Sequence, residues 1–219
     1  MIQVSNLTFK YNKNSDNYIF NNANAEFEKG KVYAVWGESG SGKSTLLSLL
    51  GGLERIQDGD ITFDNKSIRD IEDYSLRSKY VSYIFQDYLL LNHLNAVDNV
   101  VTAMEISKTE QTGRKETAKK ILLEVGISED EMRRNIKKLS GGQQQRIAIA
   151  RAIATGNDYI IADEPTGNLD KSNAFAILEI LKKLAYEQNK CVIVATHSAI
   201  IRESADKTYI VDNQKLTEV

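Results

Sequence analysis

The strongest constraint on the fold is a glycine-rich segment at residues 37–45, Gly-Glu-Ser-Gly-Ser-Gly-Lys-Ser-Thr, which directly follows the apolar run at 32–36. The apolar run is as long as a buried strand, and the sequence Thr-Leu-Leu-Ser-Leu-Leu at 45–50 favours a helix. A strand, a glycine-rich turn and a helix in this order are typical of a phosphate-binding loop. A flexible glycine turn is the alternative, but the flanking strand and helix favour the phosphate-binding loop.

Each residue type in this segment suits the binding of a triphosphate. Gly37, Gly40 and Gly42 permit backbone conformations that turn successive N–H groups toward one concave face. The helix N-terminus adds a partial positive charge, Lys43 adds a full one, and the Ser44 hydroxyl can bind Mg²⁺. We therefore expect a nucleoside triphosphate to contact Gly37, Glu38, Ser39, Gly40, Ser41, Gly42, Lys43, Ser44 and Thr45.

Length and composition limit the possible classes of protein. A chain of 219 residues fits one α/β domain that carries an inserted subdomain. The formal net charge of −2 argues against a nucleic-acid partner that needs a broad basic surface. The single cysteine, Cys191, lies in an apolar run, so we expect it in the core of a protein from a reducing compartment. The start lacks a signal segment and the apolar runs are far shorter than the ~20 residues of a membrane span, which predicts a cytoplasmic chain.

Four apolar runs, at 32–36, 81–85, 159–162 and 191–195, resemble buried parallel strands. Each is followed by a distinctive polar element: the glycine-rich segment, Gln86, Asp163-Glu164 and Thr196-His197. Ligands bind at the carboxyl ends of the strands in open parallel sheets, so these residues are predicted to share one edge.

The rest of the chain divides into two further patterns. Residues 1–31 alternate loosely between apolar and polar, as in an antiparallel sheet edge. Residues 87–157 are predicted to be helical, with 115–125 and 143–155 the clearest helices.

Asp163 and Glu164 are candidates for the chemistry of hydrolysis. Mg²⁺ prefers oxygen ligands and keeps several waters, so Asp163, Ser44 and phosphate oxygens suit it. Glu164, one residue on, can act as general base toward the attacking water. The alternative is an ordinary exposed acidic pair before the turn at Pro165.

Three further side chains have both a functional and a structural interpretation. His197 could contact the γ-phosphate or orient the water, although a lone histidine is more often structural. The Gln86 amide can touch both metal and water, or it is a surface glutamine. Tyr11 offers a ring for adenine stacking, with Tyr18 and Phe20 as alternatives.

A second anion-binding pattern, Leu-Ser-Gly-Gly-Gln at 139–143, opens the predicted helix at 144–155. A serine and two glycines at a helix N-terminus form an anion site, but Ser140 also suits a simple helix cap. A two-fold dimer would let each copy bind the other's nucleotide through this segment.

Taken together, the motifs make the chain resemble the nucleotide-binding subunit of an ATP-binding-cassette (ABC) transporter over nearly its whole length. The matching segments are 37–45, Gln86, 139–146, 163–166, 168–170 and His197. The resemblance implies ATP held between two subunits, with Ser140, Gly142 and Gln143 reaching the partner's nucleotide and Gly141 in the same signature. It also implies that Asp170 lies in a loop communicating between the two sites, that Tyr11 stacks on adenine, and that residues 87–91 receive a helix of the membrane subunit.

The variant Pro-Thr-Gly-Asn-Leu-Asp at 165–170 resembles the branch of lipoprotein release, macrolide export, antimicrobial-peptide resistance and cell division. One departure from the family pattern is Asn213-Gln214 in the closing turn, where glycine is common. A repair ATPase would carry a long coiled coil between its motifs, and a translation ATPase would carry two cassettes, so neither fits.

We therefore expect a single ABC ATPase domain over 1–219, an α/β P-loop core with a mainly parallel sheet, an N-terminal antiparallel β subdomain and an inserted helical subdomain at about 87–157. It should dimerise on ATP, hydrolyse it with Mg²⁺, and drive a permease from the inner face of the membrane, as an exporter or resistance system. The alternative is a mechanotransmission ATPase that works a membrane partner without transport. The expected catalytic residues are Glu164, His197, Gln86 and Lys43, and the expected Mg²⁺ ligands are Ser44, Gln86 and Asp163.

Overall fold

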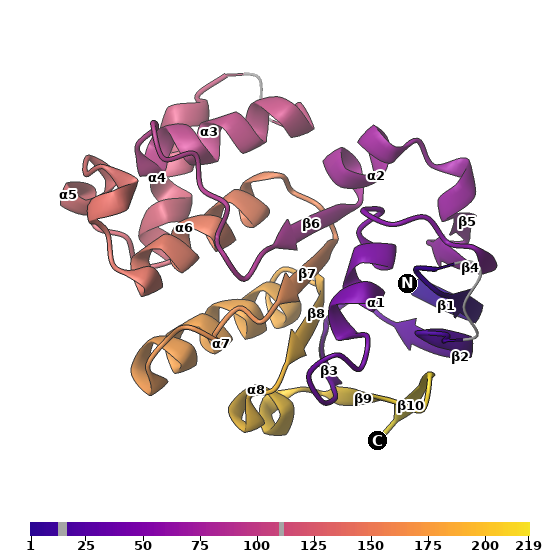
Figure 1. The fold of residues 1–219 in the computed structure, drawn as a ribbon. Coiled ribbons are helices and arrows are strands. Elements are labelled where there is room, and N and C mark those ends of the chain that lie inside the picture. The colour runs from indigo at the N-terminus through magenta and orange to yellow at the C-terminus, as the bar shows by residue number, and fades with distance from the viewer. Residues whose placement is uncertain (13–16, 110–111) are drawn as a thin grey trace.

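Two sheets form the frame of the molecule in the computed structural model, which describes residues 1–12, 17–109 and 112–219 (Figure 1). The first sheet is antiparallel and has the order β2-β1-β4-β5. Its strands are β1 (Ile2–Phe9), β2 (Phe20–Phe27), β4 (Asp58–Phe63) and β5 (Lys66–Ser67). The second sheet has the order β10-β9-β3-β8-β7-β6. Its strands are β3 (Lys31–Trp36), β6 (Val81–Ile84), β7 (Tyr159–Asp163), β8 (Cys191–Thr196), β9 (Lys207–Asp212) and β10 (Lys215–Glu218).

The four predicted parallel strands are confirmed as β3, β8, β7 and β6. The register of β3 on β8 runs from Lys31 opposite Cys191 to Trp36 opposite Thr196. A fifth parallel strand, β9, pairs with the other side of β3 and was not predicted from the sequence. The carboxyl ends of these strands therefore meet at one edge of the sheet, where the sequence places the polar residues.

Helices cover both faces of the parallel sheet (Figure 1). They are α1 (Lys43–Leu50), α2 (Asp73–Lys79), α3 (Ala96–Ser107), α4 (Arg114–Glu124), α5 (Glu129–Met132), α6 (Gly141–Ala154), α7 (Lys171–Tyr186) and α8 (Ala199–Ser204), with the 3₁₀ turns η1 (Ile68–Asp70) and η2 (Ile136–Lys138). Helices α3 to α6 fill the predicted helical stretch, and α3 packs on both α4 and α6. Within the described ranges, no helix has both the length and the apolar character that crossing a bilayer requires.

Side chains alternate between two hydrophobic cores on opposite faces of the parallel sheet. Tyr33 and Val35 of β3 belong to the first core, together with α1 and the antiparallel sheet. Val32 of β3 and Val192 of β8 belong to the second core, together with α3, α4, α6 and α7. The leucines of α1 are fully buried, and each contributes about 1.5–3 kcal/mol to folding. Helices α1 and α6 therefore pack on opposite faces of the same sheet.

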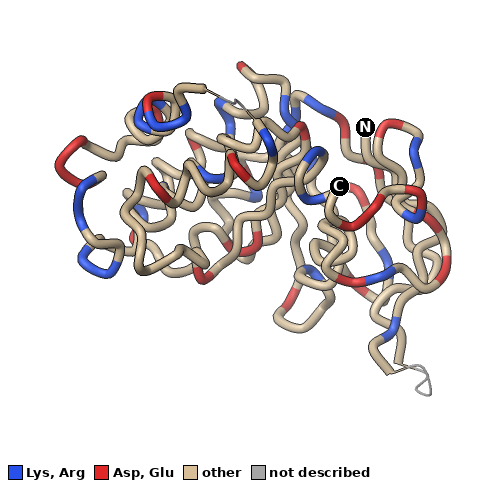
Figure 2. Tube along the Cα trace, turned by 90° about the horizontal axis from the view of Figure 1, so that it is seen from above, with Lys and Arg blue, Asp and Glu red and all other residues tan. Residues whose placement is uncertain are grey.

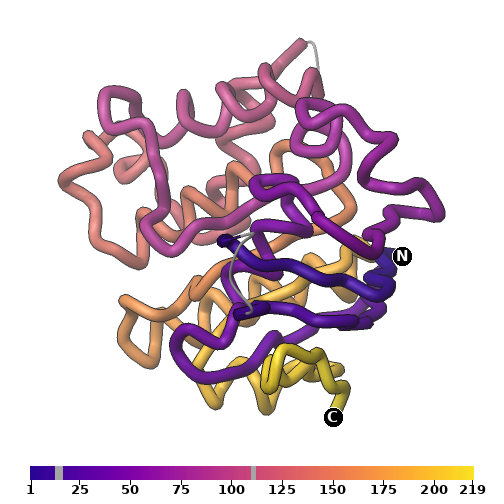
Figure 3. Tube along the Cα trace, turned by 45° about the vertical axis from the view of Figure 1, so that its right-hand side comes forward, coloured from indigo at the N-terminus to yellow at the C-terminus, as the bar shows by residue number. Residues whose placement is uncertain are grey.

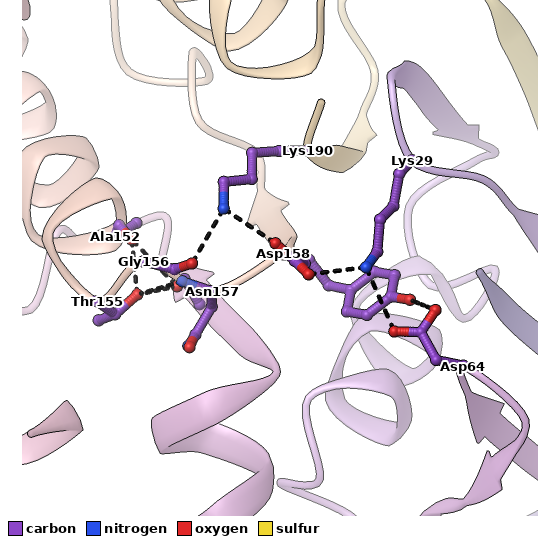
Figure 4. A network of polar contacts seen from close by, with 10 residues as sticks. Lys29, Asp64, Ala152, Thr155, Gly156, Asn157, Asp158 and Lys190 are labelled. Carbon is purple, nitrogen blue, oxygen red and sulfur yellow. Dashed lines mark hydrogen bonds and ion pairs between the residues drawn. The ribbon is translucent and has the colours of Figure 1, made fainter. Parts of the chain in front are cut away.

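A polar network joins the two sheets at the amino ends of the parallel strands, the edge opposite the candidate site (Figure 4). The Lys29 ammonium lies 2.7 Å from a carboxylate oxygen of Asp158 and 3.3 Å from one of Asp64. Lys190 lies 3.0 Å from the other oxygen of Asp158. Since Asp64 lies in the turn between β4 and β5, these pairs tie the antiparallel sheet to the starts of β7 and β8.

The C-terminal hairpin packs against the N-terminal one, as the yellow and indigo segments show in Figure 3. The backbone N–H of Asn21 donates to the Gln214 carbonyl over 3.0 Å, and β10 contacts β2. Asn213 and Gln214 adopt left-handed φ values of 46° and 64°. The turn that often contains glycine in this family is thus made here by two side-chain-bearing residues.

Charged residues of both signs are distributed over the whole trace (Figure 2). Exposed Arg133 and Arg134 follow directly after the acidic first turn of α5, which contains Glu129 and Asp130. Basic and acidic groups therefore lie next to each other at α5, in the helical part of the described chain.

Candidate active site

The glycine-rich segment connects β3 to α1 at the carboxyl edge of the parallel sheet. Gly40 and Gly42 have φ values of 80° and 112°, which glycine adopts without steric cost. Gly37 differs from our expectation, because it lies outside the left-handed region. A Cβ atom there would lie 2.5 Å from the Ser41 hydroxyl and 2.8 Å from the Val211 carbonyl, so close packing is what requires glycine.

Lys43 is buried beside its own loop. Its ammonium donates to the carbonyls of Gly37 and Glu38, each over 2.8 Å. The lysine also lines a hollow of about 270 Å³, formed by Tyr11, Ile19, Gly40, Gly42, Lys43, Ser44 and Thr45. A positive charge thus lies in a concave site beside a helix N-terminus, an arrangement that suits phosphate oxygens.

Tyr11 lies beside this hollow with 62 % of its surface exposed. Its hydroxyl is 3.2 Å from that of Thr45, and its ring meets Phe9 edge to face at 5.1 Å. Of the two alternatives, Phe20 is fully buried in the first core and is wrong as a stacking residue. The Tyr18 ring faces the Lys10 ammonium at 4.8 Å. Tyr11 is therefore the ring best placed to cover a base.

Ser44 and Asp163 come together across the strand ends. The Ser44 hydroxyl donates to Oδ1 of Asp163 over 3.1 Å. Burial raises the pKa of the Asp163 carboxyl, and the neighbouring Glu164 charge raises it further, so a cation here would stabilise the carboxylate. Sequence analysis did not single out Tyr83 of β6, whose hydroxyl favours the ionised form of Asp163 and so partly opposes the rise in the pKa of that carboxyl. Two hard oxygen ligands in this setting fit Mg²⁺.

The protein supplies few ligands for that ion. In the part of the chain that the structure describes, no three His, Cys, Asp or Glu side chains cluster as a metal site. An ion held by Ser44, Asp163 and the expected Gln86 amide would take its remaining ligands from phosphate oxygens and water, which is how Mg²⁺ commonly binds with nucleotides.

Glu164 and His197 form a close pair at the ends of β7 and β8. Nδ1 of His197 lies 2.9 Å from Oε1 of Glu164, whose side chain is only 13 % exposed, against 70 % for the imidazole. In a neutral histidine this contact requires the proton on Nδ1, which leaves Nε2 as an acceptor. The geometry therefore makes His197 a hydrogen-bond donor that orients Glu164.

Gln86 is exposed just after β6 and approaches the same place. A Cβ atom on Gly167 would lie 3.6 Å from that of Glu164 and 3.9 Å from Nε2 of Gln86. Glu164 and Gln86 therefore both lie beside Gly167. The loop, Ser44, Asp163, Glu164, His197 and Gln86 share the carboxyl edge that the sequence indicated.

The 139–143 segment lies at the start of helix α6. Helix α6 begins at Gly141, two to three residues before the expected start at 143 or 144, because Ser140 and Gln143 form a reciprocal capping box. The amide of Gln143 accepts from the Ser140 N–H over 2.7 Å and donates to Oε1 of Glu131 over 2.5 Å. Ser140 therefore caps its own helix, as the structural interpretation held.

The sequence analysis did not identify two side chains that contact this region, Glu131 and Asn173. Glu131 closes a second capping box with Ser128, and that serine-to-glutamate spacing is visible in the sequence. Asn173 contacts Asp170, the N-cap of α7, and its side chain also reaches α6. Only the tertiary packing of α6 and α7 shows the second contact.

Comparison with known proteins matches this geometry to one family. The sequence profile described as ABC transporter matches residues 20–167, more than half of the 219 residues. The chain belongs to the ABC transporter family. Among solved structures, a dimer of the ATP-binding cassette MJ0796 bound to ADP and Pi has a TM-score of 0.89 at 30% identity, covering 100% of this chain and 98% of that one. The predicted ABC ATPase fold is confirmed.

Curated ABC proteins place the chain within the family. An uncharacterized ABC transporter ATP-binding protein of Bacillus subtilis, YclH, is 41% identical over 94% of this chain and 91% of its own length. The lipoprotein-releasing system ATP-binding protein LolD of Treponema denticola is 35% identical over 100% and 98%. The macrolide export ATP-binding/permease protein MacB of Pasteurella multocida is 37% identical over 94% of this chain, which spans only 32% of MacB. These names match the branch that residues 165–170 indicated.

Proposed function

We propose that this chain is the ATP-hydrolysing subunit of an export or resistance transporter, in which two copies enclose ATP and drive a membrane permease. One observation carries the proposal: the glycine-rich loop, the Ser44–Asp163 pair and the Glu164–His197 pair all lie at the carboxyl edge of one sheet. Phosphate binding, metal binding and water activation are the parts that phosphoryl transfer to water requires.

Each residue has a role in this reaction. Lys43 and the loop N–H groups bind and orient the β- and γ-phosphates, while Tyr11 covers the base. Mg²⁺, when held by Ser44, Asp163 and Gln86, would neutralise charge on the phosphate oxygens. Glu164, oriented by His197, takes a proton from water as the water oxygen forms a bond to the γ-phosphorus and the bond to ADP breaks.

The position of α6 supports a dimeric site. Because α1 and α6 pack on opposite faces of the parallel sheet, Ser140 and the glycine-rich loop belong to different sides of the subunit. A second copy related by a two-fold axis would bring Ser140, Gly142 and Gln143 to the first copy's nucleotide. Gln143 would then have to exchange its bond to Glu131 for one to the nucleotide.

An apolar groove supports a permease partner at the inner face of the membrane. Leu53, Leu91 and Ile106 are exposed large hydrophobic residues that line one hollow of about 310 Å³ between α1, β6 and α3. Leu89, two residues before Leu91 in the chain, is exposed as well. Exposed apolar side chains that gather in a concave surface typically receive a partner. The groove includes Leu91 from the 87–91 segment, to which the family resemblance gives the same role.

Phosphate release by the purified chain tests the proposal. We expect hydrolysis of ATP that requires Mg²⁺ and stops in EDTA; no release under saturating Mg·ATP would contradict it. Reconstitution with a permease that co-purifies with the chain then separates two versions of the function. Efflux of a substrate supports transport, whereas ATP-driven movement of the permease without efflux supports mechanotransmission.

A further inference from the structure

Asn173, in the first turn of α7, holds both carboxylate oxygens of Asp170. Its backbone N–H donates to Oδ1 over 2.9 Å, and its side-chain Nδ2 donates to Oδ2 over 2.7 Å. The first bond is an ordinary helix cap. The second bond is additional, and it fixes the direction of the Asn173 amide.

The other end of that amide reaches α6. Nη2 of Arg146, three residues after Gln143, donates to Oδ1 of Asn173 over 3.2 Å. A carboxylate only accepts and a guanidinium only donates, so a single amide orientation satisfies both neighbours. Asn173 thereby connects the Asp170 loop to the helix of the 140–143 segment within one subunit.

Gly142 shows how closely the two elements meet. A Cβ atom on Gly142 would lie 2.8 Å from Oδ1 and 2.9 Å from Cγ of Asn173. Gly142 lies in helix α6 and outside the left-handed region, so backbone freedom does not explain the glycine. The glycine makes room for the Asn173 amide against the first turn of α6.

We propose that Asn173 is a positioning residue that fixes the Asp170 loop relative to the 140–143 segment, so that both reach the partner's nucleotide together. This rests on the proposed function, in which the 140–143 segment faces the other subunit's ATP, and on the family resemblance, which gives the Asp170 loop a role between the two sites. A pre-organised pair loses less conformational freedom on association than two independent segments do. Asn173 should therefore affect dimerisation more than the fold of the subunit.

Two variants separate positioning from packing. Asn173→Ala removes the amide but keeps the backbone N–H that caps α7. Asn173→Asp keeps the shape beside Gly142 and the acceptor for Arg146, but it cannot donate to Asp170 and repels it. Ser172→Ala, an exposed neighbour in the same turn, is the matched control.

The measurement is the dimer dissociation constant in Mg·ATP, by analytical ultracentrifugation of each variant in a Glu164→Gln background. Thermal unfolding without nucleotide and ATP affinity at a protein concentration that keeps the subunits apart are measured alongside. We expect both Asn173 variants to weaken the dimer about tenfold, the scale on which positioning residues modulate coupling, with the other two readouts matching Ser172→Ala.

Three results would overturn the inference. An unchanged dimer in Asn173→Ala would show that the amide does not position anything. A wild-type dimer in Asn173→Asp would reduce the residue to filling space beside Gly142. A fall in melting temperature with an unchanged dimer would show a purely structural role. If the Glu164→Gln parent does not dimerise with ATP, the proposed function is wrong and the inference about Asn173 falls with it. In the three results above the parent still dimerises, so only the inference about Asn173 fails.

Discussion

Glu164 combines the chemistry of the site with backbone strain. Its φ of 45° lies in the left-handed region, which costs a non-glycine residue about 1–3 kcal/mol. The surrounding structure holds it there: its N–H donates to the Ala195 carbonyl over 2.9 Å, and its carboxylate pairs with His197. The strain thus coincides with the group that we propose as general base.

Glu164→Gln should separate binding from hydrolysis. The amide keeps the size of the side chain but cannot take a proton, so turnover should fall by about 10²–10⁴-fold while ATP still binds. Steady-state ATPase assays and nucleotide-binding measurements on the same preparation check both parts. Near-normal turnover would place the base elsewhere, with His197 the next candidate.

Lys43→Ala should weaken Mg·ATP binding. Removing a charged donor from a buried site forfeits about 1.5–3 kcal/mol, equivalent to roughly 10–100-fold in affinity. Isothermal titration calorimetry with Mg²⁺ measures the change, with exposed Lys66→Ala of β5 as the control. Wild-type affinity in Lys43→Ala would remove the glycine-rich loop from its proposed role.

At the scale of elements, sequence patterns predicted four of the parallel strands, but they did not predict strand β9 or the start of helix α6. The runs in β3, β6, β7 and β8 are almost wholly apolar because both faces of the sheet are covered. Strand β9, Lys-Thr-Tyr-Ile-Val-Asp, mixes polar and apolar residues because it lies nearer the edge of the sheet, and its pairing with β3 depends on tertiary contacts. The start of α6 was missed because two glycines conceal a helix whose first turn is set by the capping box.

The apolar groove should bind the permease without affecting the chemistry. Leu91→Glu places a charge in a surface meant to be desolvated, so co-purification with the permease should drop by at least tenfold. ATPase activity of the isolated chain should stay unchanged. Leu123→Glu is a matched control, since Leu123 is 52 % exposed on α4 and is not among the residues that line the groove. Equal loss in both variants would contradict a specific docking groove.

At the scale of the whole molecule, the network around Asp158 makes stability depend on pH. Hydrogen bonds from Lys29 and Lys190 lower the pKa of the Asp158 carboxyl from its ordinary 3.8. A carboxylate whose folded pKa is lowered stabilises the protein above its ordinary pKa and loses that contribution as pH falls through the lowered value. This contribution should therefore be present at neutral pH, begin to decline near the ordinary pKa of about 4, and disappear only below the lowered pKa of Asp158.

Asp158→Asn tests that contribution. Because the side chain is 49 % exposed, solvent screening limits the loss to no more than about 1 kcal/mol, or about 2–4 °C in melting temperature for a chain of this size. Melting curves between about pH 2 and about pH 7 should show the deficit at neutral pH and its decline as the pH falls through the lowered pKa of Asp158. The control is exposed Asp87→Asn. A deficit of equal size at every pH would mean that Asp158 acts through packing and not through charge.

The sequence indicates most of the candidate site because its residues follow strand ends in short, recognisable segments. The sequence does not indicate which elements pack on which face of the sheet. That α1 and α6 lie on opposite sides of one sheet, and that Asn173 touches Gly142, depend on how separate elements pack. The proposal of a second subunit therefore rests on the three-dimensional arrangement together with the family resemblance, and not on any one motif.

The central claim is that Ser140 and its neighbours complete the partner's nucleotide site, and ATP-dependent association tests it directly. The Glu164→Gln protein with Mg·ATP should elute as a dimer in size-exclusion chromatography, and the nucleotide-free protein as a monomer. Adding Ser140→Arg puts a long cation where the phosphate must approach the α6 N-terminus, so the dimer should disappear while the glycine-rich loop still binds ATP. A Ser140→Arg, Glu164→Gln protein that dimerises with ATP would show that Ser140 only caps its own helix, and the composite site would be wrong.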